Sequence, residues 1–302
     1  MNNRVNIVLN SNSLWQKVKH QTEQALSCGA LKSIPTDYEL IKNEEIDFLV
    51  RIVTNLGRKE KAKKEQKKLG KDFNPFLPYE KDLFVADISD THICLLNKFN
   101  VVDYHLLIVT RDFEEQETLL NLNDFAALCA CLLQIDGLGF YNNGKIAGAS
   151  QRHKHLQLVP FPWVPELPKT PIDQVIKTVT YQDKIGQLPC FNFAHGITKI
   201  AFNDNNNVLE LAQQRLDSYH DLLKHLKISI NEEGKPEPYN LLVTREWMMI
   251  IPRSQPKYQS ISINSLGFAG ALLVKDEQQM KLLREVKPLT ILEKVSNRLI
   301  NN

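Results

Sequence analysis

The chain has 302 residues and a mass of 34.7 kDa, and its 43% of hydrophobic and 24% of charged residues are typical of a globular protein. Its net charge of +2 is too small to indicate that the whole molecule binds nucleic acid or a membrane surface. Without a signal-peptide core, a membrane-length apolar stretch or a disulfide framework among its five scattered cysteines, we expect a soluble, cytoplasmic protein.

A predicted helix and a lysine-rich run precede the first predicted strands. Ser13 and Gln16 have the spacing of a helix capping box, and the following apolar residues keep helical periodicity up to Gly29, a residue type common at helix ends. Residues 58–71 form a lysine-rich run with few apolar side chains, which predicts a solvated surface loop or helix end.

The middle of the chain has the pattern of a strand pair followed by a buried helix. Residues 91–97 and 101–110 are rich in Ile, Val, Leu and Tyr and are separated by a short turn. Asn123 precedes the almost wholly apolar stretch 125–135, which predicts a buried helix capped by this asparagine. Residues 140–144 then indicate the end of a strand and a turn.

The second half of the chain mixes helices and strand pairs in the same way. A proline-rich crossover is followed by an amphipathic helix near 208–226 and a strand pair at 240–244 and 247–251. This pattern predicts an α+β fold, mainly an antiparallel sheet with flanking helices, in two elaborated halves. The boundaries that we predict are 1–165 for the first half, 166–188 for the crossover and 189–302 for the second half.

The most informative motif follows the turn at 140–144. Gly148-Ala149-Ser150 is a run of small residues, where a backbone can approach an anion closely. His153, His155 and Gln157 come next at alternate positions, so on a strand they share one face. Neutral imidazole is a nucleophile near pH 7, and an amide can donate hydrogen bonds to phosphoryl oxygens. The motif therefore indicates transfer chemistry at phosphorus.

Other interpretations of the motif remain open at this point. His153 and His155 have the spacing of a metal-ligand pair on a strand, or their alternation could be a surface coincidence. Ser150 and His153 could belong to a serine hydrolase, although the sharp Gly-x-Ser-x-Gly turn of many such enzymes is missing. His153 could also be a purely structural, hydrogen-bonded histidine.

The string from Gly148 to Gln157 resembles the active-site motif of the diadenosine tetraphosphate phosphorylases, also called ATP adenylyltransferases. This family belongs to the histidine-triad superfamily, together with the galactose-1-phosphate uridylyltransferases. Other segments resemble the family in the same order along the chain, namely residues 96–102, 141–142, 239–240, 252–253 and 264–275. The resemblance implies a histidine-triad-like fold, with a catalytic N-terminal half and an ATP adenylyltransferase-type C-terminal half that completes the nucleotide site.

The resemblance also implies a reaction. His155 would be the nucleophile that takes AMP from diadenosine tetraphosphate and passes it to inorganic phosphate, reversibly giving ATP and ADP, and His153 and Gln157 would be the other catalytic residues. The substrate-binding residues that it implies are Lys59, Asn97, Lys98, Asn142, Gly148, Ala149, Ser150, Gln151, Gln157, Asn264, Ser265, Leu266, Ala271 and Lys275. A divalent cation, Mg or Mn, would accompany the polyphosphate, and neither a metal held by protein ligands nor an organic cofactor is implied.

Two other classes of function, a different transferase and a binding protein, are also compatible with the sequence. A uridylyltransferase acting on a sugar 1-phosphate would share the glutamine that follows the two histidines. The His-Pro-His usual in that family is replaced here by His153-Lys154-His155. The chain could instead be a nucleotide-binding module without catalysis, or an RNA-binding protein that uses residues 58–71. For the favoured function we expect small nucleotides and inorganic phosphate as partners, with no nucleic acid and no membrane, and the sequence indicates no oligomeric state.

Overall fold

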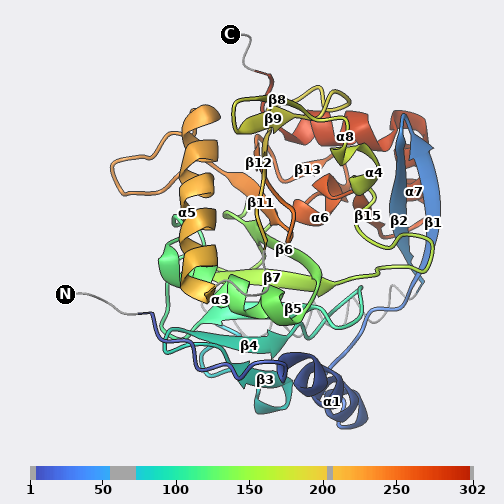
Figure 1. Ribbon diagram of the computed structural model, residues 1–302. Helices are drawn as coiled ribbons and strands as arrows, with labels where there is room; N and C mark the ends of the chain where they lie inside the picture. Colours follow the sequence, from blue (N-terminus) through green and yellow to red (C-terminus); the bar gives the residue numbers. More distant parts are fainter. Residues whose placement is uncertain (1–4, 55–72, 203–206, 300–302) are drawn as a thin grey trace.

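The computed structural model describes residues 5–54, 73–202 and 207–299 (Figure 1). A ten-stranded antiparallel sheet with flanking helices dominates it, which confirms the predicted α+β class. Within the three described ranges, every helix is too short or too polar to span a bilayer. The predicted loop or helix end at 58–71, with Lys59, lies entirely outside the described residues.

The large sheet has the strand order β3-β4-β5-β7-β6-β11-β12-β10-β9-β8, and each neighbouring pair is antiparallel. Its strands in chain order are β3 Phe84–Asp87, β4 His92–Leu96, β5 Leu106–Thr110, β6 Gly137–Asn142, β7 His155–Pro160, β8 Thr180–Gln182, β9 Ile185–Gln187, β10 Gly196–Lys199, β11 Tyr239–Val243 and β12 Trp247–Pro252. A smaller sheet joins β1 Thr36–Asn43 to β2 Ile46–Val53 and, in parallel, β2 to β15 Ala271–Val274. β13 Lys257–Tyr258 and β14 Ile261–Ser262 form a two-stranded ribbon.

The helices gather on the two faces of the large sheet (Figure 1). They are α1 Leu14–Ser27, α3 Leu122–Gln134, α4 Asp173–Ile176, α5 Val208–His225, α6 Ser265–Phe268, α7 Glu277–Val286 and α8 Pro288–Val295, with a short 3₁₀ helix at Lys81–Leu83. Helices α1, α3 and α5 pack on one face in a single apolar cluster with the sheet. α4, α6, α7, α8 and the small sheet pack on the other face in a second cluster.

The predicted strand pairs and long helices are confirmed. The stretches 91–97 and 101–110 contain β4 and β5, which pair with each other, although β5 begins only at Leu106. The stretches 240–244 and 247–251 form β11 and β12, and the two predicted helices are α3 and α5.

The helix predicted after Ser13 is α1 and Ser13 is its N-cap residue, but the predicted capping box does not form, and the predicted cap of α3 is wrong. The side chain of Ser13 makes no capping bond and donates to the backbone oxygen of Asn10 instead. The side-chain oxygen of Gln134 accepts hydrogen bonds from the backbone N–H groups of Ser13 and Leu14. Helix α3 is capped by Asn121 rather than by Asn123, since Asn121 and Asp124 form a reciprocal capping box.

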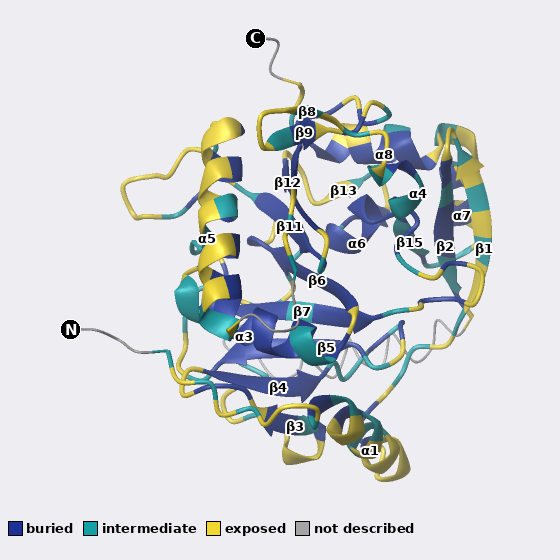
Figure 2. Ribbon diagram, in the orientation of Figure 1, coloured by how far each residue is buried: buried dark blue, intermediate teal, exposed yellow. Residues whose placement is uncertain are grey.

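Strand β7 separates the two apolar clusters and determines which way the motif faces. Leu156 and Leu158 belong to the cluster beneath α3 and α5, and Val159 belongs to the opposite cluster. Since side chains alternate along a strand, His155 and Gln157 lie on the face away from α3 and α5. The central strands are buried except for the half-buried Gln157 in β7, whereas the outer side of α5 is exposed (Figure 2).

The large sheet runs without interruption through both halves of the chain. β6 of the first half pairs with β11 of the second half, with Asn142 opposite Asn240. Residues 166–188 carry α4, β8 and β9. The boundaries at 165 and 189 stay a prediction.

Candidate functional site

The imidazole of His155 is oriented through its Nδ1 atom, which leaves Nε2 available as a nucleophile. His155 is 5% exposed, and its Nδ1 lies 2.8 Å from the backbone oxygen of His153. A carbonyl only accepts hydrogen bonds, so Nδ1 carries the proton and Nε2 carries the lone pair. Burial lowers the pKa of His155 to about 4, which keeps the ring neutral at physiological pH. Within the described residues, no hydrogen bond engages Nε2.

His153 differs because both of its ring nitrogens are engaged. Its Nε2 donates to the backbone oxygen of Thr110 at 2.8 Å, and its Nδ1 accepts from the side-chain amide of Asn74 at 3.0 Å. Phe76, from the same loop as Asn74, packs against the rings of both histidines. This geometry favours an orienting role for His153 and does not support the metal-pair interpretation. Among the residues that the structure describes, no three His, Cys, Asp or Glu side chains gather as a metal site.

Gln157 is oriented by two hydrogen bonds in series, from Asn97 through His105, that the sequence did not reveal. The side-chain N–H of Asn97 lies 3.2 Å from Nδ1 of His105, and Nε2 of His105 lies 2.9 Å from the side-chain oxygen of Gln157. Burial lowers the pKa of His105 to about 4, so the neutral ring accepts at Nδ1 and donates at Nε2. The oxygen of Gln157 is therefore occupied, and its NH₂ group is left as a donor on the same face as His155.

The buried side chain of Gln116 clamps the backbone of the motif. Its oxygen accepts from the N–H of His155 at 2.8 Å, and its NH₂ donates to the backbone oxygens of Asn142 at 2.9 Å and of His155 at 3.2 Å. Gln116 thus bridges β6 and β7 beyond Phe140, the last residue of β6 that pairs with β7. No sequence pattern marked Gln116, because its partners are 26 and 39 positions away.

Several predicted substrate-binding residues meet around one cavity of about 280 Å³. Gly148 lies at its edge with a φ of +98°, and an added Cβ there would come within 2.8 Å of the backbone oxygen of Ile263. This close approach explains why the position requires glycine. The cavity is also lined by Arg51, Val101 and Val102 from the first half of the chain and by Asn264, Leu266, Ala271 and Lys275 from the second.

A second cavity, of about 160 Å³, lies at the other end of the small-residue run. Ser150, Gln151 and His153 line it, together with Asn74 and two phenylalanines. The structure therefore places Gly148 and Ser150, two positions apart in the run, in the walls of different cavities, with the half-buried Ala149 between them.

The remaining predicted residues lie in supporting positions. Asn142 is buried, and its side-chain oxygen accepts from Asn240 and from the N–H and hydroxyl of Ser265. The ammonium of Lys98 forms an ion pair with Glu80 at 2.5 Å and does not line either cavity. Their roles toward substrate stay predictions.

The buried guanidinium of Arg253 joins the two halves behind the small-residue run. It donates to the backbone oxygens of Ala147 at 3.3 Å and of Ile263 at 3.2 Å, and also to the side chain of Asn240. Burial lowers the pKa of Arg253 to about 9. Arg253 thereby fixes the backbone just before Gly148 against the backbone just before Asn264.

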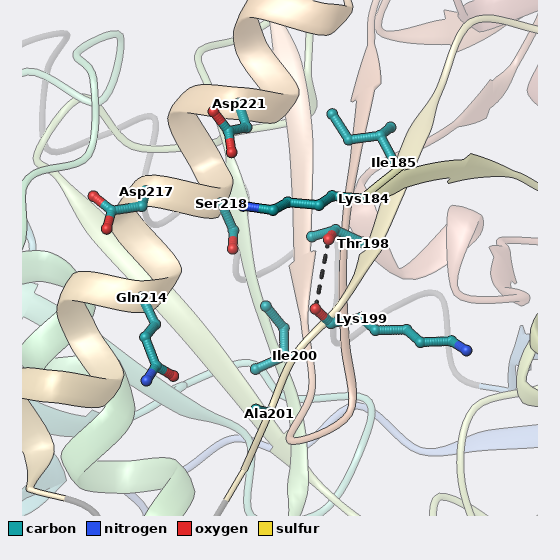
Figure 3. Close-up of a pocket in the computed structure, with 10 residues that line it drawn as sticks. All are labelled: Lys184, Ile185, Thr198, Lys199, Ile200, Ala201, Gln214, Asp217, Ser218 and Asp221. Atoms are coloured by element: carbon teal, nitrogen blue, oxygen red, sulfur yellow. Dashed lines mark hydrogen bonds between the residues drawn. The ribbon is translucent and has the colours of Figure 1, made fainter. Parts of the chain in front are cut away.

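A separate cavity of about 260 Å³ lies between α5 and strands β9 and β10 (Figure 3). Lys184 and Lys199 stand in its wall with Asp217 and Asp221, so its charges balance, and it includes none of the predicted site residues. We assign it no role.

Two family descriptions together match nearly the whole chain. Residues 4–178 match the family described as the Ap4A phosphorylase N-terminal domain, and residues 189–298 match the ATP adenylyltransferase C-terminal domain. Ap4A is diadenosine tetraphosphate.

Curated proteins and solved structures agree with these matches. The chain is 28% identical over 310 residues to diadenosine 5',5'''-P1,P4-tetraphosphate phosphorylase 2 of Saccharomyces cerevisiae, over 90% of each protein. It is 27% identical over 306 residues to Protein APA1 of the same yeast, over 89% of this chain and 88% of that protein. The crystal structure of yeast Ap4A phosphorylase Apa2 superposes with a TM-score of 0.76 at 25% identity, covering 97% of this chain and 98% of that one. The complex of Apa2 with Ap4A shares the fold, with a TM-score of 0.74 at 24% identity, covering 96% of this chain and all of that one.

Proposed function

This chain belongs to the Ap4A phosphorylase family, since that family's N-terminal domain matches residues 4–178, and we propose that it cleaves Ap4A with inorganic phosphate to ATP and ADP. It is an enzyme of the nucleotidyltransferase class. The observation that carries the proposal is the state of His155, whose proton lies on Nδ1 and whose Nε2 is free of hydrogen bonds within the described residues.

The proposed reaction has two steps at the α-phosphorus. Nε2 of His155 attacks, the bond from phosphorus to the bridging oxygen breaks, and ATP leaves with that electron pair. AMP then stays on the ring of His155. The Nδ1 proton of that ring remains hydrogen-bonded to the backbone oxygen of His153. An oxygen of inorganic phosphate attacks in turn, the phosphorus–nitrogen bond breaks and ADP leaves. In reverse, ADP adenylylates the enzyme and ATP collects the AMP.

The groups around His155 suit phosphate better than water as the acceptor. The NH₂ of Gln157 can donate to a phosphoryl oxygen as charge grows on it, and Lys275 carries a positive charge in the wall of the cavity that Gly148 also lines. An amide cannot remove a proton from water, whereas phosphate is already an anion. This favours phosphorolysis over hydrolysis, and the family assignment favours it over uridylyl transfer or binding without catalysis.

The proposal predicts strict dependence on phosphate. With Ap4A and phosphate, we expect ATP and ADP in equal amounts, separated by anion-exchange chromatography. Without phosphate, we expect at most about one equivalent of ATP per enzyme, with AMP retained on the protein as an acid-labile, base-stable adduct on His155. Equal product yields with and without phosphate would overturn the proposal.

The same proposal includes a divalent cation and a cellular location. A divalent cation, Mg or Mn, accompanies the polyphosphate and is bound by the phosphate oxygens of the substrate, where it would offset their charge. The protein works in the cytoplasm, where the free thiols of its five cysteines would stay reduced.

The hydrogen bonds from Gln116 to the motif predict how a substitution of Gln116 changes kcat for phosphorolysis. Gln116→Leu leaves the buried N–H of His155 and two carbonyls without partners, so Nε2 shifts relative to the phosphorus. We expect kcat for phosphorolysis to fall about 100-fold, because small misplacements of reacting groups cost rates of this size. Gln116→Glu keeps the acceptor and loses both donated bonds, so its kcat should be intermediate. A Gln116→Leu protein with wild-type kcat would contradict the clamp.

A further inference from the structure

The ring of Phe76 packs against the imidazole that is proposed to carry AMP. The centres of the Phe76 and His155 rings are 5.3 Å apart, and the Phe76 ring also lies 5.6 Å from that of His153. Phe76 is 7% exposed and His155 is 5% exposed, so water has little access to either ring. The proposed reaction gives Phe76 no part, and the sequence did not mark it as a site residue.

Apolar packing holds Phe76 on the face of the sheet that carries the catalytic residues. Val109 of β5 pairs with His155 of β7, and Leu107 pairs with Gln157. Residues directly opposite each other in two paired strands point to the same face of the sheet. Phe76 packs on this face in a small cluster, separate from the two large ones, with Ile93, Leu95, Leu107 and Val109.

One amide group fixes this phenylalanine relative to the histidine pair. The side-chain oxygen of Asn74 accepts a hydrogen bond from the backbone N–H of Phe76 at 2.9 Å, and its NH₂ donates to Nδ1 of His153 at 3.0 Å. Nε2 of His153 donates in turn to the backbone oxygen of Thr110 in β5. Asn74 and His153 therefore attach the loop of Phe76 to the sheet beside His155.

We propose that Phe76, held by Asn74 and His153, keeps water away from the AMP adduct on His155, so that the adduct survives until phosphate attacks it. The inference rests on the proposed function and deepens it. The group bonded to Nε2 lies next to the imidazole, and the ring of Phe76 takes up space there that water would otherwise fill. A phenyl ring also offers water neither a strong hydrogen-bond acceptor that would orient it nor a base that would remove its proton.

Water and phosphate compete for the adduct by the same in-line step. In hydrolysis, the water oxygen bonds to the α-phosphorus and the phosphorus–nitrogen bond breaks, with its electron pair returning to Nε2 of His155. One proton of the water passes to solvent, and AMP leaves. With phosphate as the acceptor, the product is ADP instead. Because water is far more abundant than phosphate, a phosphorylase has to exclude water from the adduct until phosphate binds.

The test follows the adduct after it has formed, so that defects in binding Ap4A cancel. The enzyme is incubated without phosphate with Ap4A radiolabelled at its α-phosphates, and unbound nucleotide is removed by gel filtration. Release of AMP in phosphate-free buffer gives the rate of hydrolysis, and formation of ADP after phosphate is added gives the rate of phosphorolysis. For Phe76→Ala, we expect the ratio of the first rate to the second to rise about tenfold or more, because water gains access to the adduct.

Three further variants separate shielding from a general loss of structure. Phe76→Leu keeps a smaller apolar side chain, so its ratio should lie between those of the wild type and of Phe76→Ala. Asn74→Ala keeps the ring but removes its attachment to His153, so its ratio should rise as well. Leu77→Ala removes a 44% exposed side chain of the same loop that lies outside the cluster of Phe76, and it should keep the wild-type ratio. If thermal unfolding shows that Phe76→Ala is not folded, Phe76→Leu and Asn74→Ala carry the test.

The outcomes distinguish this inference from the proposed function. A wild-type ratio in Phe76→Ala, or in both Phe76→Leu and Asn74→Ala, would overturn the inference. A proportional fall of both rates would also overturn it, because the ring would then only orient His155. A wild-type enzyme that forms no adduct, or whose adduct gives no ADP when phosphate is added, would instead overturn the proposed function.

Discussion

Replacing His155 with alanine is expected to lower kcat for phosphorolysis of Ap4A by about 10⁴-fold or more, because the covalent route disappears with Nε2. The neighbouring His153 cannot take its place, since both of its ring nitrogens are committed to Thr110 and Asn74. The variant should also fail to retain AMP when incubated without phosphate. Rates of ATP and ADP formation, together with label counted on the denatured protein, measure both effects.

His153→Ala is the matched comparison for this prediction. It removes the neighbouring imidazole but keeps the backbone oxygen of residue 153, which accepts the Nδ1 proton of His155. We therefore expect a loss nearer 10- to 100-fold, with the adduct still detectable, because residue 153 acts through position rather than by attack. Thermal unfolding of both variants would confirm that they are folded. Near-normal turnover by His155→Ala would refute its assignment as the nucleophile.

Replacing Lys154 with methionine is expected to lower the free energy of unfolding by about 3–5 kcal/mol, because it leaves a buried charge without its partner. Lys154 is 1% exposed and faces away from its two histidine neighbours. Its ammonium lies 2.7 Å from the carboxylate of Asp124, which is fully buried and also 3.1 Å from Nε2 of His92. Burial by itself would raise the pKa of Asp124, but the hydrogen bond from His92 and the charge of Lys154 lower it overall.

Urea unfolding at pH 7 of Lys154→Met and of a double variant, Lys154→Met with Asp124→Leu, tests this account. The double variant removes the stranded carboxylate and should recover part of the loss. Recovery should be incomplete, since Asp124 also accepts from the N–H of Asn121 in the capping box of α3. Arg284→Met breaks an exposed ion pair with Glu39 and should cost about 1 kcal/mol or less. Equal losses for Lys154→Met and Arg284→Met would contradict the prediction.

The sequence by itself determined the features that depend on local periodicity and on short spacing. Alternation along 153–157 places His155 and Gln157 on one face, because successive side chains of any strand point to opposite sides. The strand pairs and the helices α3 and α5 follow from the same kind of pattern. The string from Gly148 to Gln157 was enough to indicate the family that residues 4–178 and 189–298 match.

Only the tertiary structure decided which groups hold these side chains. His105 orients Gln157 from 52 positions away, Gln116 clamps His155 from 39 positions away, and Gln134 replaces the predicted cap of α1 from 120 positions away. Such partners depend on strand order and on the path of loops, and a hydrogen bond requires a donor and an acceptor within about 3 Å. Spacing along the chain specifies that distance within one element, whereas between elements it is set by how the apolar faces pack.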